Sequence, residues 1–303
     1  MKELKFVSSY STNPIVVSET KEKIILKSNY PGEYSDSDIL PLYFYPSKIN
    51  TKNTLLFIHG LGTKNIEYLK WFPKQFSKLG YNAYLMILPY HFERTPKGFK
   101  SGELFLKPDY LRERFEHAVV DVLTSLNYIK NKFNDKNYLM GFSFGGMIAT
   151  IAAAYFKVNG LSLCVTGGNF YHITWKSFAT KVLRVKYEEN KECDIEKCKK
   201  FHGKDFYKYL ESINSPDISK DSAPMTCYEY DPLTFAKFVS APTIMFRAIF
   251  DIFIPKRSSL ELYEKLGARN KEIHSIFSGH LTSYAYRNYI LKKTVKFFQK
   301  YSA

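Results

Sequence analysis

Three widely spaced residues have the types that serine-based acyl transfer needs. Ser143 is the centre of a G-x-S-x-G pattern at residues 141–145, and Asp251 and His280 follow it in that order. A serine hydroxyl is a weak nucleophile until an imidazole takes its proton, and a carboxylate must orient that imidazole and stabilise its charged form. We therefore expect Ser143 to be the nucleophile, His280 the general base and Asp251 the acid of a catalytic triad.

The segments on either side of Ser143 predict a sharp turn from a strand into a helix. Residues 138–140 have strand character, and residues 147–156 (MIATIAAAYF) are apolar and rich in alanine, as in a buried helix. In that setting the two glycines of the pattern remove Cβ atoms that would clash where strand and helix meet, and the serine hydroxyl projects above the sheet edge. The pentapeptide alone also occurs by chance in glycine-rich turns, so other features must support this interpretation.

Two backbone N–H groups are candidates for an oxyanion hole. The first belongs to Phe144, because the start of a helix brings its N–H and a positive dipole end beside the serine hydroxyl. The second follows the apolar run at residues 54–58, which is typical of a strand buried on both faces and ends in HGLG at residues 59–62. Ligands of parallel α/β sheets bind at the carboxyl ends of strands, so we expect the Leu61 N–H to be the second donor.

The pattern near the end of the chain places both Asp251 and His280 after strands. Residues 243–250 and 273–277 are predicted strands, with a helix predicted at 255–266 between them. Residues that directly follow parallel strands meet at one edge of the sheet, even when they are far apart in sequence. Asp251 and His280 are therefore expected to converge on Ser143.

Other residues compete for these roles. Asp231, in a Tyr-Asp-Pro sequence, is the alternative acid; Asp251 is preferred because it directly ends a strand. Four other histidines could be the base, and each is less well placed than His280. His274 lies inside the last predicted strand, His59 directly precedes the expected oxyanion loop, and His172 and His202 fall in the middle segment of the chain.

The remaining pattern alternates strands and helices, except in one segment. Further strands are predicted at residues 23–26, 40–45, 83–88 and 161–166, the first two as an antiparallel start, and helices at 66–79 and 108–130. Residues 170–240 lack this alternation and are rich in lysine and aromatic residues, so we interpret them as a mostly helical inserted cap. The expected division is a core at 1–169, the cap at 170–240 and the rest of the core at 241–303.

Several residues near the predicted strand ends are candidates for a substrate pocket. Loops after strands can contribute polar groups, and aromatic residues of the cap can cover the site. For the loop after 83–88 the alternative is a proline-pinned structure with an internal Glu93/Arg94 charge pair, and for the aromatic residues it is simple packing of the cap. The candidates are His59, Gly60, His91, Arg94, Phe170 and Trp175.

Composition excludes several classes of protein. The 303 residues are 45% hydrophobic, which argues against disorder, and their formal net charge of +15 is scattered without a nucleic-acid-reading module. None of the four cysteines forms a C-x-x-C pair, so we expect neither a metal nor a cofactor, and whether Cys193 and Cys198 pair stays open. The first residues lack a signal-peptide apolar stretch and no run is long enough to span a membrane, so we expect a cytoplasmic protein without stable membrane insertion. The oligomeric state is left open.

With these motifs in place the chain resembles the α/β-hydrolase superfamily over nearly its whole length. The matching residues are HGLG at 59–62, GFSFGG at 141–146, Asp251 after the penultimate strand and His280 after the last. The resemblance implies a three-layer fold, with an eight-stranded, mostly parallel sheet and helices on both faces. It also implies a Ser-Asp-His triad and a cap inserted after the sixth strand.

The function expected from these observations is that of a carboxylesterase for small to medium apolar acyl groups. A thioesterase, an amidase or peptidase, and an acyltransferase would use the same triad, and differ in a pocket shape that the sequence does not show. A catalytically silent hydrolase fold used for binding is the alternative from another class. The positive charge also raises the possibility of a lipase acting at a membrane surface.

Overall fold

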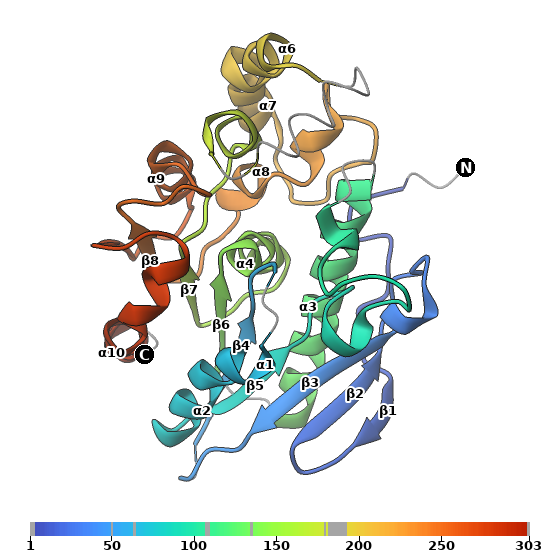
Figure 1. The fold of residues 1–303 in the computed structure, drawn as a ribbon, viewed down its shortest axis with the longest axis vertical. Coiled ribbons are helices and arrows are strands. Elements are labelled where there is room, and N and C mark those ends of the chain that lie inside the picture. The colour runs from blue at the N-terminus through green and yellow to red at the C-terminus, as the bar shows by residue number, and fades with distance from the viewer. Residues whose placement is uncertain are drawn as a thin grey trace.

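A single sheet of nine strands organises the molecule (Figure 1). The computed structural model describes residues 4–49, 51–62, 65–106, 110–133, 136–178, 180 and 193–301. Its strands are β1 (Val16–Glu19), β2 (Lys23–Lys27), β3 (Ile39–Tyr45), β4 (Asn53–Ile58), β5 (Asn82–Met86), β6 (Lys136–Phe142), β7 (Gly160–Cys164), β8 (Thr243–Ala248) and β9 (Lys271–Ile276).

The sheet order is β1-β2-β3-β5-β4-β6-β7-β8-β9. The pairs from β1 to β5 are antiparallel, and all pairs from β5 to β9 are parallel, which confirms a mostly parallel sheet with an antiparallel start. The expected count of eight strands is wrong, because Val16–Glu19 adds a ninth at the edge. All four side chains of this strand are exposed, so no buried face marks it in the sequence.

Helices cover both faces of the sheet. They are α1 (Ile66–Leu69), α2 (Trp71–Lys78), α3 (Leu111–Phe133), α4 (Phe144–Tyr155), α6 (Ile195–Lys200), α7 (Phe206–Ser212), α8 (Pro232–Ala236), α9 (Lys256–Lys265) and α10 (Arg287–Tyr301). The single helix predicted at 66–79 is divided at Lys70 into α1 and α2.

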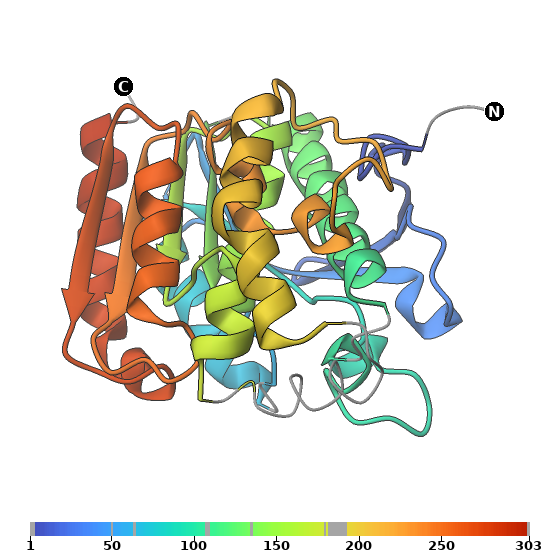
Figure 2. The same cartoon turned by 90° about the horizontal axis from the view of Figure 1, so that it is seen from above.

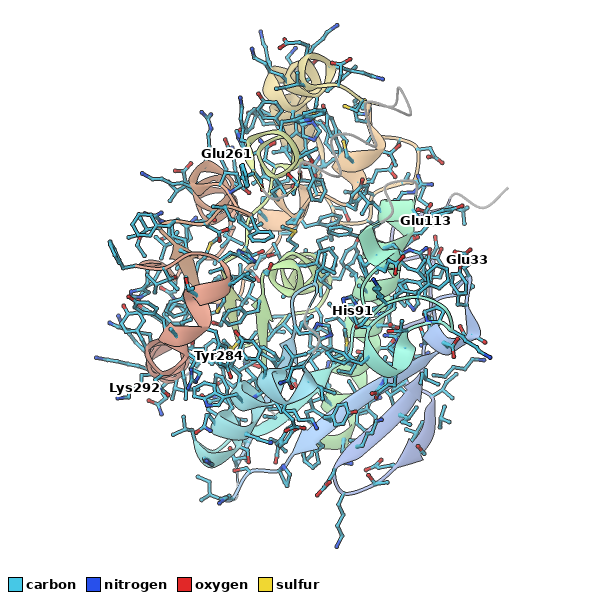
Figure 3. All side chains as sticks on the ribbon, viewed as in Figure 1. Glu33, His91, Glu113, Glu261, Tyr284 and Lys292 are labelled. Carbon is cyan, nitrogen blue, oxygen red and sulfur yellow. The ribbon has the colours of Figure 1, made fainter. Side chains whose placement is uncertain are left out.

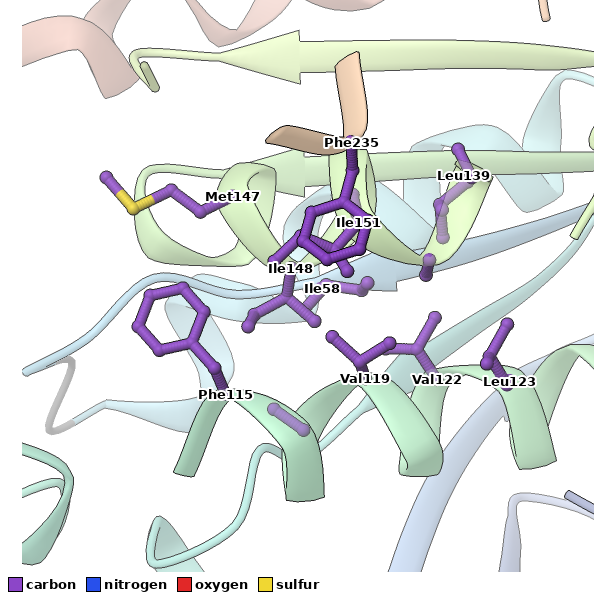
Figure 4. Packing of buried hydrophobic residues seen from close by; sticks show 14 of the residues in the cluster. Ile58, Phe115, Val119, Val122, Leu123, Leu139, Met147, Ile148, Ile151 and Phe235 are labelled. Carbon is purple, nitrogen blue, oxygen red and sulfur yellow. The ribbon is translucent and has the colours of Figure 1, made fainter. Parts of the chain in front are cut away.

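The hydrophobic core forms two clusters, one on each face of the sheet, because successive side chains of the central strands point to opposite faces. On one face Ile58 of β4 packs with Val119 of α3 and Ile148 of α4 (Figure 4). On the other, Phe57 of the same strand stacks on Phe72 of α2 with ring centroids 5.5 Å apart, and α10 completes that cluster. Burial on both faces explains the continuous apolar run of this strand.

The segment between β7 and β8 is built from short helices. It contains the π-helix η5 (His172–Lys176), α6, the π-helix η6 (Phe201–Asp205), α7, the 3-10 helix η7 (Thr226–Glu229) and α8. Helix α8 packs against α4 and α9, and Figure 1 shows α6 and α7 at the top of the molecule beyond them. All four cysteines are free, so Cys193 and Cys198 form no disulfide. The domain boundaries at 170 and 240 stay a prediction.

In the part of the chain that the structure describes, no helix combines the length and the apolar character needed to cross a bilayer.

Candidate active site

Ser143 occupies a strained turn between β6 and α4. Its φ of 53° and ψ of −119° lie where L-residues are rarely found, and Phe144 directly begins the helix. The turn requires the flanking glycines: a Cβ on Gly141 would stand 2.3 Å from the carbonyl oxygen of Gly145, and one on Gly145 would stand 2.4 Å from that of His59. The sharp strand-to-helix turn that the G-x-S-x-G pattern predicts is therefore present.

The three residues of the predicted triad form one hydrogen-bonded chain. The Oγ of Ser143 lies 2.7 Å from Nε2 of His280, and Nδ1 of His280 lies 2.8 Å from Oδ2 of Asp251. The other carboxylate oxygen, Oδ1, accepts the N–H groups of Phe253 and Ile254 at 2.9 and 2.8 Å. These bonds hold the carboxylate where Oδ2 accepts a hydrogen bond from the Nδ1–H of His280, which leaves Nε2 as the acceptor for the serine hydroxyl.

The rival acid Asp231 lies in a different environment. It is fully buried, and its carboxylate accepts the backbone N–H groups of Asn169, Phe170 and Leu233 at 2.8, 2.6 and 2.9 Å. Burial raises its pKa to about 6, against the opposing effect of these bonds. Asp231 therefore caps α8 and ties the start of the inserted segment to it, whereas Asp251 is the carboxylate bonded to His280.

The alternative bases have other partners. His274 lies 3.3 Å from Glu272 and stacks on Phe246, and His172 lies 3.3 Å from Glu261. His202 lies between two thiols, with Nδ1 3.4 Å from Sγ of Cys198 and Nε2 3.5 Å from Sγ of Cys227. Only His280 is bonded to the Ser143 hydroxyl in the described chain.

His59 holds the loop that follows β4 and is itself buried. Its Nε2 accepts the Leu88 N–H at 3.1 Å, so Nδ1 carries the proton and donates to the carbonyl oxygen of Gly60 at 2.8 Å. Burial, together with His91, lowers the pKa of His59 to about 3, so the ring is neutral at pH 7. The Gly60 carbonyl and the Leu61 N–H belong to one trans peptide and point in opposite directions, so fixing the carbonyl also fixes the N–H.

Neither His91 nor Arg94 presents a polar group to the triad. The Arg94 side chain is fully buried, with Nη2 2.7 Å from Oδ2 of Asp121 on α3 and Nη1 donating to Ile87 O at 2.9 Å. The Glu93/Arg94 pair of the alternative interpretation is wrong, because Glu93 pairs with Lys23 at 2.7 Å.

His91 lies in the interior, where its Nδ1 is 2.8 Å from Pro89 O (Figure 3). Its ring meets that of His59 edge-on at 5.0 Å, and burial lowers the pKa of His91 to about 4. His91 therefore packs against the residue that holds the loop after β4. The sequence showed its place after a strand but not this contact, which joins two loops.

The aromatic pocket candidates are packed into the molecule. Phe144 meets Phe105 and Phe115 with ring centroids 4.6 and 4.8 Å apart, and Phe115 in turn meets Phe170 at 5.6 Å. Trp175 is only 5% exposed. Trp175 is thus buried, Phe170 is half-buried against Phe115, and aromatic rings fill the space on the Phe144 side of Ser143.

Two surface hollows, of about 570 and 320 Å³, are lined by residues around Lys21 and Tyr155, and neither includes a triad residue. Both are remote from the chemistry that Ser143 can perform, so the candidate site is the surface around Ser143 and His280.

Comparison with known proteins connects this geometry to a described fold. Residues 53–184 match the family model described as alpha/beta hydrolase fold. No curated protein matches the chain in sequence.

Solved structures resemble it along most of its length. A novel cold-adapted esterase from an Arctic intertidal metagenomic library is 16% identical, with 96% of this chain and 98% of that chain covered and a TM-score of 0.56. The alpha/beta hydrolase GrgF from Penicillium sp. sh18 is 18% identical, with 92% and 98% covered and a TM-score of 0.57. A structure described with LipS and LipT, two metagenome-derived lipolytic enzymes, is 13% identical, with 86% and 97% covered and a TM-score of 0.55. Identities this low show a shared fold.

Proposed function

We propose that this chain, which has the α/β-hydrolase fold, is a serine hydrolase that cleaves carboxylic esters through an acyl-enzyme on Ser143. The observation that carries the proposal is the continuous chain of hydrogen bonds from the Ser143 hydroxyl through His280 to Asp251, at 2.7 and 2.8 Å. Both distances suit proton transfer to the imidazole and charge stabilisation by the carboxylate.

The reaction follows from these atoms. Nε2 of His280 takes the hydroxyl proton while Oγ of Ser143 bonds to the ester carbonyl carbon, and Asp251 stabilises the imidazolium. The carbonyl oxygen becomes an oxyanion, held by the N–H groups of Leu61 and Phe144. The N–H of Phe144, as the first of α4, has no acceptor within its helix and can serve this role.

The intermediate then collapses in two stages. The bond to the alcohol oxygen breaks, and the alcohol leaves with the proton from His280. Water enters, gives a proton to the same imidazole and attacks the acyl carbon, which releases the acid and returns the proton to Ser143.

A small to medium acyl group fits the surroundings of the nucleophile. The rings of Phe144, Phe105 and Phe115 occupy the adjoining interior, which limits the room for a long acyl chain on that side of Ser143. The names of similar solved structures, an esterase and lipolytic enzymes, favour ester substrates over amides. A thioesterase, an amidase and an acyltransferase remain the alternatives on the same triad.

A substrate panel with a matched pair of variants tests the proposal. The purified chain is assayed on p-nitrophenyl esters of graded acyl length, on thioesters and on anilides, beside Ser143→Ala and the control Ser275→Ala, whose serine is exposed on β9. We expect the highest kcat/KM on short esters, a loss of at least about 10³-fold in Ser143→Ala and no change in the control. Unchanged ester turnover in Ser143→Ala would refute the proposal, and a preference for thioesters or anilides would reassign the substrate.

A further inference from the structure

Large apolar side chains lie exposed around the Asp251–His280 pair. Asp251 has an exposed apolar residue on each side in sequence, and His280 directly precedes another. Phe178, Phe277 and Leu281 are 79%, 70% and 76% exposed. We call the following six residues the apolar rim: Phe178, Ile249, Phe250, Ile252, Phe277 and Leu281.

Contacts between three loops bring residues of the rim together. Because β8 and β9 are parallel neighbours, the loops after them leave the same edge of the sheet, where Figure 2 shows the two strand ends side by side in orange and red. Phe250 donates its N–H to Ser278 O at 3.0 Å, and its ring meets that of Phe277 at 4.9 Å. Phe178, from the inserted segment, donates its N–H to Ile252 O at 3.1 Å.

The charges around the rim are mostly positive. Residues 176–180, 249–257 and 277–287 contain four basic residues but a single carboxylate, Asp251, which is bonded to His280. Of the four, Lys176, Lys256 and Arg257 are exposed, although Arg257 also pairs with Glu261 at 2.8 Å. The whole chain carries +15. Exposed aromatic and aliphatic side chains among basic residues suit a surface of anionic lipid headgroups above acyl chains.

We infer that the apolar rim docks this protein on an anionic lipid surface. The rim side chains enter the boundary between headgroups and acyl chains, and the flanking basic residues contact the headgroups. A second copy of the chain is disfavoured as the occupant, because pairing two rims would bring the basic flanks of two strongly positive molecules together. Since rim residues flank Asp251 and His280 in sequence, docking also brings the triad near ester groups at the lipid surface. That last step rests on the proposed function, whereas docking does not.

Vesicle sedimentation with Ser143→Ala chains tests docking without hydrolysis. The vesicles contain phosphatidylcholine alone or equal parts of phosphatidylcholine and phosphatidylglycerol. The rim variant carries Phe178→Ser and Phe277→Ser, and a control carries Ile15→Ser and Val17→Ser, which replace residues 51% and 60% exposed near β1. We expect binding to the mixed vesicles that weakens with salt and falls at least about tenfold in the rim variant but not in the control.

Three outcomes would overturn the inference. They are no binding to the mixed vesicles, equal loss in the rim variant and the control, or a chain that sediments as a dimer and becomes monomeric only in the rim variant. The same rim substitutions in the Ser143 chain should leave turnover of soluble p-nitrophenyl acetate unchanged. Failure of docking is thus distinguishable from failure of the proposed hydrolase activity, which this assay measures separately.

Discussion

Gly60 lies so close to Ser143 that a Cβ on Gly60 would stand 3.0 Å from the Cβ of Ser143 and 3.2 Å from Phe142 O. The loop after β4 and the turn before α4 are therefore in direct contact, with no side chain between them. This contact brings the peptide that contains the Leu61 N–H to the side of Ser143. The first glycine of the HGLG sequence is therefore explained, because a side chain at residue 60 would clash with Ser143.

A methyl group at residue 60 should disturb catalysis more than folding. In Gly60→Ala the loop must move away from Ser143, which displaces the Leu61 N–H from the developing oxyanion. We expect kcat on a short p-nitrophenyl ester to fall about 10²-fold. Gly32→Ala, whose added Cβ would meet nothing closer than 3.4 Å, is the matched control and should retain activity. Equal kcat values for the two variants would argue against an oxyanion role for this loop.

Asp251 and Asp231 should respond differently to the same substitution. Asp251→Asn keeps the shape but presents an amide to the imidazole, so kcat should fall at least about 10³-fold while the melting temperature changes little. Asp231→Asn replaces an oxygen that accepts buried N–H groups, and it should lower the free energy of unfolding by about 1–3 kcal/mol while kcat stays near that of the parent. The two variants are compared by steady-state kinetics and urea unfolding. The reverse pattern would make Asp231 the catalytic acid.

Buried histidines should make the fold sensitive to acid. Burial lowers the pKa of His59 to about 3 and those of His91 and His202 to about 4, from an ordinary value of 6.5. As the pH falls below 6.5, these histidines therefore bind protons in the unfolded chain but stay neutral in the folded chain. Their contribution to the free energy of unfolding is fully present above pH 6.5 and is lost as the pH falls toward 4. At pH 5 the loss is about 2 kcal/mol for each histidine.

Asp231 acts in the opposite direction. Burial raises the pKa of Asp231 from 3.8 to about 6. Its contribution to the free energy of unfolding therefore grows as the pH falls through 6, by about 1 kcal/mol between pH 7 and pH 5. The histidines outweigh it, and urea unfolding should show a free energy of unfolding several kcal/mol lower at pH 5 than at pH 7. A free energy that is flat or higher at pH 5 would mean that these rings are not buried as neutral groups.

Much of this fold could be predicted because its signals are local. The strand, turn and helix around Ser143 follow from glycine spacing and apolar runs, and the antiparallel start and parallel remainder are confirmed. The approach of Asp251 and His280 to Ser143 could be predicted because residues that follow parallel strands meet at one edge of the sheet. Strand β1 could not be predicted, because all of its side chains are exposed.

The sequence could not show what depends on partners far along the chain. Arg94 is fully buried and held by Asp121 on α3, and Phe170 packs on Phe115. The apolar rim was also missed, since its residues come from three separate loops that only the folded sheet brings together. The catalytic roles of Ser143, Asp251 and His280 stay predictions for experiment.

Covalent labelling of the nucleophile tests the central claim most directly. The folded chain is treated with a fluorophosphonate, which reacts with a serine activated by a neighbouring imidazole, and the modified peptide is located by mass spectrometry. We predict a single phosphonyl adduct on Ser143 that is absent in Ser143→Ala and strongly slowed in His280→Ala. No adduct on the folded parent, or an adduct on another serine with Ser143 unmodified, would contradict the assignment of Ser143 as the nucleophile of a serine hydrolase.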